Sequence, residues 1–161
     1  MRTRDNTCCF TGHRDISNVL YKDIIDRLEI LVMRLIKNGY KYFACGGALG
    51  FDTVAATYII SLKNRGFDVK LVLMLPCTDQ TAKWSRDDVA IYNHIMDLAD
   101  EVIYVSNSTY YAGCMQKRNR ALVDASKACI CFLSEYGSSG TRQTVDYAIK
   151  CGLKIANVAD E

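Results

Sequence analysis

Short apolar segments alternate along this chain with longer segments in which apolar residues recur every three or four positions. The short segments are rich in Val, Ile, Leu, Cys and aromatic residues, which is typical of buried strands. These predicted strands are Thr7–Phe10, Tyr42–Cys45, Lys70–Leu75, Glu101–Val105, Ala128–Leu133 and Lys154–Asn157. The helices predicted between them are Ile16–Asn38, Gly50–Arg65, Thr81–Leu98, Cys114–Ala125 and Gly140–Cys151. This alternation predicts a parallel sheet covered on both faces, because right-handed crossovers place helices there.

The predicted fold is an α/β, Rossmann-like, doubly wound domain with a parallel sheet of about six strands. No linker, low-complexity tract or repeat interrupts the pattern, so residues 1–161 are expected to form a single domain. The apolar stretches, such as Leu71–Leu75, fall far short of the roughly 18 residues of a membrane-spanning helix. Residues Met1–Asn6 are polar and charged, and the apolar h-region of a signal peptide does not follow them, so we expect no signal peptide and a cytoplasmic location.

The composition argues against two kinds of partner, nucleic acid and metal ions. The chain has 20 basic and 18 acidic residues, and nucleic-acid binding depends on many cationic contacts, so nucleic acid is not an expected partner. The eight cysteines lie largely within apolar strands, where buried free thiols are expected. Their C-C and C-x-C spacings, with only two histidines, do not match a structural metal site.

The loops that follow the predicted strands are unusually rich in small, polar and basic residues. Ligands bind outside the carboxyl ends of the strands in an open parallel sheet, so these loops are expected to share one edge. The candidate ligand-binding residues are Thr11, Gly12, His13, Arg14, Gly46, Gly47, Gly50, Asp52, Arg118, Asn119, Ser139, Gly140, Thr141 and Arg142. The sequence therefore predicts one small-molecule site along this edge.

The glycine loop at Gly46–Gly50 follows a strand and opens a helix, where backbone N–H groups can approach a phosphate. Cys45 stands where a G-x-G-x-x-G dinucleotide motif needs glycine, and a plain turn also explains the glycines. Asp52, in the first helical turn, is a candidate acceptor for ribose hydroxyls or a base amine. Complementing the helix dipole explains this carboxylate equally well.

Arg118 and Arg142 lie near the predicted starts of two helices, where the positive end of the helix dipole disfavours a cation. A bound anion would reverse that effect, and Arg14 on the first loop would join as a bidentate clamp. Three such arginines favour a phosphate-bearing ligand over side chains that point into solvent. His13 is a candidate acid, base or phosphate donor, since its loop position is unlike that of a core histidine.

Hydroxyl groups and aromatic rings add to this edge. Ser139 and Thr141 would form an anion nest with the amides of a helix start, although helix capping explains them as well. Trp84, the only tryptophan, and the paired Tyr110 and Tyr111 are able to stack on a base or ribose. Packing is the role we expect for Trp84, and the tyrosines are candidate contacts.

Four blocks of residues, in order, closely resemble the YpsA-like branch of the SLOG superfamily. They are Cys9–Arg14, Gly46–Asp52, Asp79-Gln80 followed by Trp84, and Arg118-Asn119 followed by Val123-Asp124. The resemblance spans almost the whole chain and implies a Rossmann-like fold. It also implies a role in binding a nucleotide or a nucleotide-derived ligand such as ADP-ribose or NAD, with no further cofactor required.

The wider superfamily includes LOG-type phosphoribohydrolases, which use a P-G-G-x-G-T-x-x-E loop to release a base from a nucleoside monophosphate. Thr144 stands at the position of that Glu and cannot supply a carboxylate. The superfamily's DprA type binds single-stranded DNA, which would need a basic track with interleaved aromatics. The nearly neutral charge of this chain does not offer such a track.

The leading hypothesis is a domain that holds a nucleotide, ADP-ribose or NAD type of ligand and acts as a sensor or regulatory module. Arg14, Arg118 and Arg142 would meet its phosphates. An enzyme alternative is a nucleotide or ADP-ribose N-glycosidase that uses Asp52 or His13 in place of the missing Glu. A protein-interaction module is a further alternative, and self-association is compatible with a fold of this kind.

Overall fold

The computed structural model describes residues 1–134 and 139–159, without the side chains of residues 19 and 139. Its strands are β1 (Thr7–Gly12), β2 (Tyr42–Cys45), β3 (Lys70–Leu75), β4 (Glu101–Tyr104), β5 (Ala128–Phe132) and β6 (Lys154–Asn157). Its α-helices are α1 (Asn18–Lys37), α2 (Phe51–Asn64), α3 (Arg86–Leu98), α4 (Cys114–Asp124) and α5 (Ser139–Lys150). A short 3-10 helix at Arg4–Asn6 precedes β1.

The strands form one parallel sheet in the order β4-β3-β2-β1-β5-β6. The chain builds this sheet outward from β1 to β4, then crosses back to add β5 and β6 on the other side of β1. The strand order therefore reverses between β1 and β5, which is the topological switch point where ligands bind in folds of this type.

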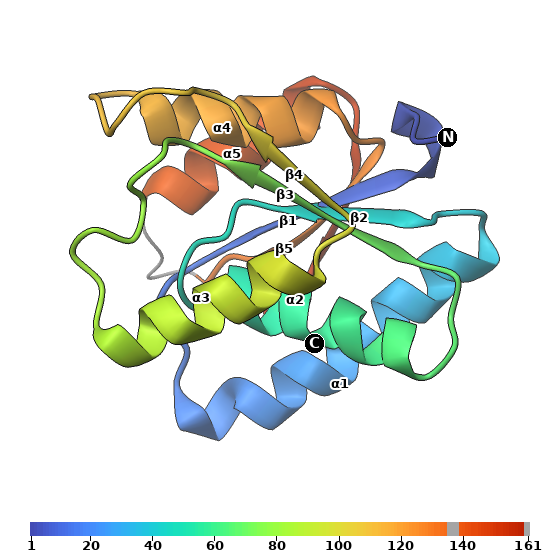
Figure 1. Cartoon of the computed structure of the whole chain (residues 1–161). Helices are drawn as coiled ribbons and strands as arrows, with labels where there is room; N and C mark the ends of the chain where they lie inside the picture. The colour runs from blue at the N-terminus through green and yellow to red at the C-terminus, as the bar shows by residue number, and fades with distance from the viewer. Residues whose placement is uncertain (135–138, 160–161) are drawn as a thin grey trace.

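The helices cover both faces of the sheet (Figure 1). α1, α2 and α3 lie on one face, and α4 and α5 lie side by side on the other. The long connection from β4 through α4 to β5 carries the chain from one face to the other. The predicted Rossmann-like, doubly wound α/β fold is confirmed.

The two faces of the sheet differ in side-chain size. Phe10 and Phe43 belong to the core beneath α1, α2 and α3, and their rings stack with centroids 6.0 Å apart. Their neighbours Cys9 and Ala44 point the other way, into the core shared with α4 and α5, because successive strand residues face opposite sides. α4 packs on this face against β1 and β3, next to the end of β2 from which the glycine loop follows.

Two element boundaries differ from the sequence prediction in ways that affect the site. β1 runs to Gly12 instead of ending at Phe10, because residues through Gly12 stay in parallel register with β5. α3 begins at Arg86 instead of Thr81, because Ser85 caps it by accepting a hydrogen bond from the Asp88 N–H at 3.1 Å. Trp84 consequently lies in the turn before α3 and not within the helix.

In the described ranges, no helix is long and apolar enough to cross a membrane. The cytoplasmic location and the single domain stay predictions. Cys8, Cys9, Cys45 and Cys129 are buried free thiols, as expected from their strand positions, and Cys131 is buried as well. Among residues 1–134 and 139–159, no cluster of three or more His, Cys, Asp or Glu side chains is placed to hold a metal ion.

Candidate functional site

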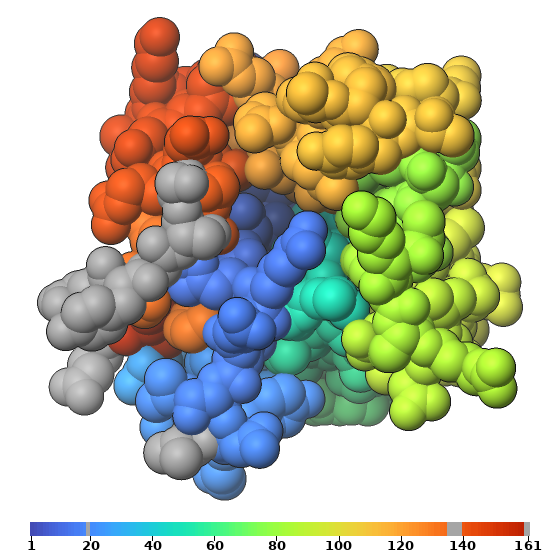
Figure 2. Space-filling view, turned by 90° about the vertical axis from the view of Figure 1, so that its left-hand side faces the viewer, coloured from blue at the N-terminus to red at the C-terminus, as the bar shows by residue number. Residues whose placement is uncertain are grey.

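The carboxyl edge of the sheet brings together segments that are far apart in the sequence. Figure 2 views the molecule from the side on which the strands end. Blue atoms of the first loop stand between the teal glycine loop and the orange-red atoms of α5, with the gold segment around α4 above them. The surface is hollowed between these segments, which is where the switch point places a ligand.

A cavity of about 150 Å³ lies at this edge, and we call it the central cavity. It is lined by Thr11, Gly12, Arg14, Ala48, Asp52, Met115, Arg118, Asn119, Gly140 and Thr141. β1, the glycine loop and the N-terminal parts of α2, α4 and α5 all contribute to it. Eight of these ten residues are among the predicted candidates, so the structure gathers most of the predicted set.

The backbone of Gly46, next to this cavity, hydrogen-bonds to three side chains. Its carbonyl accepts hydrogen bonds from Arg118 Nη1 and, at 3.2 Å, from Gln80 Nε2. Its N–H donates to Asp52 Oδ2 at 3.2 Å, and Ala48 N–H donates to the same oxygen at 3.2 Å. The glycine loop is therefore fixed by side chains from α2, α4 and the turn that follows β3.

Arg118 is buried, with only 5% of its surface exposed. Burial lowers its pKa, while the charge of Asp52 opposes that shift. Its Nε donates to Asn119 Oδ1 at 2.8 Å, and its Nη2 lies 3.8 Å from Met115 Sδ. A guanidinium has five N–H donors, so these contacts and the bond to Gly46 leave donor capacity at a side chain that lines the central cavity.

Asp52 is also buried, with 6% of its surface exposed. Burial raises the pKa of its carboxyl group, while Arg118 and the N–H groups of Ala48 and Gly46 act in the opposite direction. Burial has the larger effect. The carboxylate thus orders the glycine loop and balances the Arg118 charge, a role that neither of the two sequence-based explanations included.

At positions 46 and 50 the neighbouring residues leave no room for a side chain unless they move. A Cβ on Gly46 would overlap the Arg118 guanidinium, and a Cβ on Gly50 would overlap the backbone of Arg14. Gly50 also has φ +78°, in the region that side chains other than glycine rarely adopt. The glycines therefore allow Arg118 and the first loop to approach the loop backbone closely.

His13 differs from the exposed loop histidine that its position led us to expect. Only 8% of its surface is exposed, and its ring packs edge-on against Phe132. Its Nε2 accepts a hydrogen bond from the Ser134 N–H at 3.1 Å, and its carbonyl accepts one from Phe51 N–H at 3.1 Å. Burial lowers the pKa of the ring. His13 thus holds the end of β1 to its neighbours instead of facing the central cavity.

The predicted three-arginine clamp is not assembled as a unit. Arg14 is exposed and lines the central cavity beside Arg118. Arg142 is exposed and is absent from the described lining of that cavity. Solvent exposure, the alternative weighed for all three arginines, therefore describes Arg14 and Arg142, whereas Arg118 is buried.

The remaining candidates divide between the central cavity and its surroundings. Thr141 is buried and lines it with Gly140 at the start of α5. The Ser139 side chain lies outside the described residues. Thr144 donates from Oγ1 to the Gly140 carbonyl at 3.0 Å, so it closes the first turn of α5. Gly47 borders a neighbouring cavity instead.

Two further cavities adjoin the central one. The first, the aromatic cavity, has a volume of about 320 Å³, shares Arg14, Ala48 and Asp52 with the central cavity, and contains Trp84 and Tyr92. The second, the α4–α5 cavity, has a volume of about 350 Å³. It shares Asn119 and Gly140 with the central cavity and adds Arg120, Lys150 and other polar side chains of both helices.

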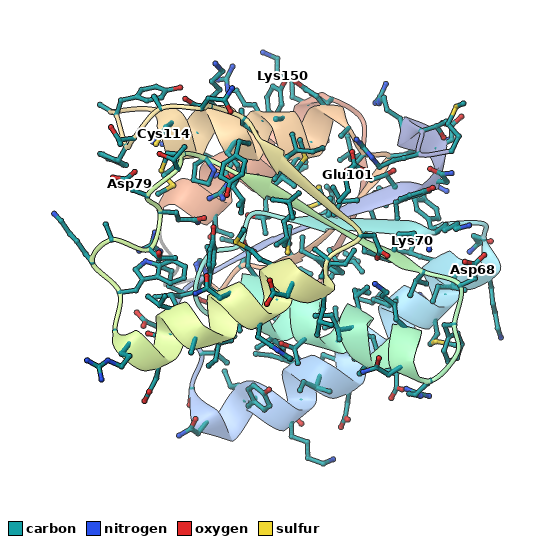
Figure 3. The ribbon with its side chains drawn as sticks, in the orientation of Figure 1. Asp68, Lys70, Asp79, Glu101, Cys114 and Lys150 are labelled. Atoms are coloured by element: carbon teal, nitrogen blue, oxygen red, sulfur yellow. The ribbon has the colours of Figure 1, made fainter. Side chains whose placement is uncertain are left out.

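Some residues of the site carried no sequence signal, and others carried a weak one. In the sequence, Gln80 stands out only within the Asp79-Gln80 pair of the four resembling blocks, and nothing marks Tyr92 as a site residue. Asp79 and Cys114 both lie on the side where β3 and β4 end (Figure 3). Asp79 Oδ1 accepts from the Tyr110 N–H at 2.7 Å, although the Tyr110 side chain is 60% exposed.

The fold and this site define a Rossmann-like domain with a buried arginine beneath a glycine loop at the switch point. The chain belongs to the YpsA family, described as the YspA SLOG family, whose model matches residues 8–154. The resemblance inferred from the four residue blocks is therefore confirmed.

Bacterial relatives cover different shares of this chain. The uncharacterized SPbeta prophage-derived protein YoqJ of Bacillus subtilis (strain 168) is 32% identical over 140 residues, or 80% of this chain and 81% of YoqJ. A UPF0398 protein of Macrococcus caseolyticus is 30% identical over 110 residues, or 67% of this chain and 59% of that protein. The match thus spans about three fifths of the UPF0398 protein.

Two solved structures of DNA processing protein A share the fold. The protein from Streptococcus pneumoniae matches with a TM-score of 0.67 and 18% identity, over 92% of this chain and 48% of its own. The protein from Helicobacter pylori matches with a TM-score of 0.55 and 16% identity, over 97% and 78%.

One prediction about partners is wrong. The nearly neutral net charge led us to set nucleic acid aside, yet the Helicobacter pylori protein, which has this fold, has a single-stranded DNA binding mode. Net charge averages over the whole surface and says nothing about a local track. Neutral charge is therefore no ground for excluding nucleic acid from a chain with this fold.

Proposed function

We propose that this protein binds a nucleotide or nucleotide-derived ligand, with the phosphate end in the central cavity, and acts as a sensor or regulatory domain. The observation that supports the proposal most strongly is Arg118, a buried guanidinium that lines that cavity. Burying a cation is costly unless it is paired and hydrogen-bonded. Asp52 supplies the opposite charge, and a phosphate would take up the remaining donors.

The surroundings of Arg118 also suit an anion. Arg14 adds a second cation at the cavity wall, and Thr141 lies there at the N-terminal turn of α5. The first N–H groups of a helix have no partner within the helix, and the helix dipole attracts negative charge to that end. Arginine, hydroxyl and helix start together are the donor set of a phosphate site.

The size of the central cavity limits what it holds. A volume of about 150 Å³ suits a phosphate group and part of a ribose but not a whole dinucleotide. A ligand of the ADP-ribose or NAD type would therefore extend into an adjoining cavity. We propose this type of ligand because the adjoining spaces share residues with the central cavity on two sides.

An N-glycosidase activity is less well supported by the same geometry. Asp52 Oδ2 already accepts two backbone N–H groups, and the His13 Nε2 accepts from Ser134 N–H. A general acid or base needs a reactive atom within hydrogen-bond reach of the substrate. Binding, not turnover, is the function we propose.

Single-stranded DNA is a second candidate ligand. The fold is shared with DNA processing protein A, and the α4–α5 cavity extends the central cavity with Arg120 and Lys150. Arg120 lies over the Tyr147 ring, 5.0 Å from its centroid. Cations along a groove with an aromatic ring beside them are the elements of single-strand recognition.

The test is the melting temperature of the purified protein with AMP, ADP, ATP, GTP, NAD, ADP-ribose and a short single-stranded oligothymidine. Selective binding to the folded state must raise it. We expect a rise with one nucleotide class that is absent in Arg118→Ala and retained in Arg142→Ala. A rise with oligothymidine alone, lost in Arg120→Ala, would favour the second candidate, and no rise with any compound would contradict both.

A further inference from the structure

We propose that the aromatic cavity is the subsite for the nucleobase of the same ligand. This inference rests on the proposed function, because it assumes that the phosphate end occupies the central cavity. The aromatic cavity lies between the first loop, α2 and α3. Sequence considerations alone favoured a packing role for Trp84; in the structure its ring packs against Tyr92 and also lines this cavity.

The two cavities are contiguous. Arg14, Ala48 and Asp52 line both of them, so a ligand that leaves the central cavity past these residues enters the aromatic cavity directly. With a volume of about 320 Å³, the aromatic cavity has room for a base and part of a ribose. A nucleotide is a molecule with this shape, since it has a charged end and a flat, largely apolar end.

The aromatic walls suit a flat ring. Trp84 and Tyr92 meet edge to face, with ring centroids 5.4 Å apart and planes at 86°. Both rings are partly buried and both line the cavity. Offset and edge-on contacts between aromatic rings are favourable, and stacking of bases on such side chains tolerates any base.

The mouth of the cavity exposes apolar surface to solvent. Tyr21 of α1 is 45% exposed and Ile91 of α3 is 47% exposed, and both side chains line this cavity. Concave sites lined by apolar and aromatic groups, with a few polar groups, are typical of small-molecule binding. A base lying between Tyr21 and Ile91 would cover this surface.

Hydrogen bonds connect the aromatic cavity to Arg118. The Tyr92 hydroxyl donates to Gln80 Oε1 at 3.5 Å, and Gln80 Nε2 donates to the Gly46 carbonyl that also binds Arg118. Burial raises the pKa of Tyr92 to about 12, so this hydroxyl keeps its proton. The Gly46 carbonyl thus links the side chains of the base subsite to Arg118 in the phosphate subsite.

Polar groups at the cavity would face the edge of the base. Asp88, in the first turn of α3, and Asn18, at the start of α1, both line it. A carboxylate only accepts hydrogen bonds, whereas an amide both donates and accepts. Bases that carry an exocyclic amine would therefore bind better here than uracil, which has none.

The experiment uses Trp84 as its own reporter, because it is the only tryptophan in the chain. Tryptophan emission is recorded during titration with AMP, GMP, UMP and ribose 5-phosphate, and melting temperatures are measured on the same samples. We expect the nucleotides to quench Trp84, and ribose 5-phosphate to raise the melting temperature without quenching. We also expect Ile91→Asp, at the exposed mouth, to weaken AMP binding tenfold or more while ribose 5-phosphate binding is unchanged.

Matched variants keep the outcome unambiguous. Trp84→Leu should lose AMP affinity to the same degree as Ile91→Asp, whereas Ile30→Asp, at an exposed isoleucine of α1 that lines neither cavity, should lose none. The inference is overturned if AMP raises the melting temperature through Arg118 but leaves Trp84 emission unchanged and Ile91→Asp binds AMP normally; the proposed function then stands. If neither the nucleotides nor ribose 5-phosphate bind at all, the proposed function and the inference fail together.

Discussion

Arg118 and Asp52 both hydrogen-bond to the backbone of the same residue, Gly46. Arg118 donates to the Gly46 carbonyl, and Asp52 accepts from the Gly46 N–H. The two buried charges come from different helices on opposite faces of the sheet, so the loop between them is held from both sides. The conformation of the glycine loop therefore depends on the same guanidinium that we propose to bind phosphate.

Replacing Arg118 tests both of these roles. Arg118→Ala removes the charge that counters the burial of Asp52 and the hydrogen bond from the guanidinium to the Gly46 carbonyl, a loss of roughly 2 kcal/mol. A domain of this size has about 5–15 kcal/mol of stability, so the variant should remain folded. Urea denaturation should show this loss, and titration with ADP should show no binding. Arg142→Ala, on the exposed face of α5, should change neither quantity by more than about 0.5 kcal/mol.

Gly46→Ala should disturb binding through Arg118 alone. The added Cβ would overlap the guanidinium, and overpacking of this kind costs about 1–3 kcal/mol. We expect loss of nucleotide binding in calorimetric titration with ADP. Gly39→Ala is the control, since a Cβ there meets nothing within 4 Å although φ is +92°. Equal ligand affinity in the two variants would contradict the positioning of Arg118 by Gly46.

Asp52→Asn should alter the pH dependence of stability in a defined direction. Because burial raises the pKa of Asp52 above its ordinary 3.8, the folded state holds the proton more tightly than the unfolded state. Its stability contribution is thus present at acidic pH and is lost as the pH rises through the raised pKa. Relative to the wild type, the Asn variant should gain stability with rising pH above 3.8. A difference that stays constant from pH 4 to pH 8 would contradict the burial of this carboxyl.

Asp100→Asn should behave in the opposite way. Burial alone would raise the pKa of Asp100. The Lys63 ammonium and the Leu71 N–H, at 2.7 and 2.8 Å from its carboxylate, lower the pKa by more, so it lies below the ordinary 3.8. Its contribution is present above pH 3.8 and is lost as the pH falls through the lowered pKa. We expect the Asn variant to lose about 1 kcal/mol at pH 7. Unfolding at pH 7 and at pH 3 measures this, and Asp68→Asn, in an exposed ion pair with Lys41, should cost less.

The order of strands and helices was predictable because periodicity reports directly on burial. β2, β3 and β6 have the predicted ends, since apolar runs bounded by polar residues leave little choice. The start of α3 was not predictable from periodicity, because the Ser85 cap overrides the helical pattern before Arg86.

It was predictable that the site residues meet at one edge of the sheet, but the chemistry of each residue there was not. The switch-point rule placed Thr11, Asp52 and Arg118 at one edge. Sequence does not show which side chain is buried, so it treated Arg118 and Arg142 alike although one is buried and the other exposed. The hydrogen bonds of His13 come from distant segments, and the loop position gave no sign of them.

The most direct test of the account is calorimetric titration of ADP into the wild-type protein and into Arg118→Lys. A lysine keeps the positive charge but lacks the planar fork that reaches Gly46 and a phosphate together. Our proposal that Arg118 binds the phosphate predicts saturable binding to the wild type and a loss of at least tenfold in affinity for Arg118→Lys. Equal affinity of the two proteins for ADP would contradict it.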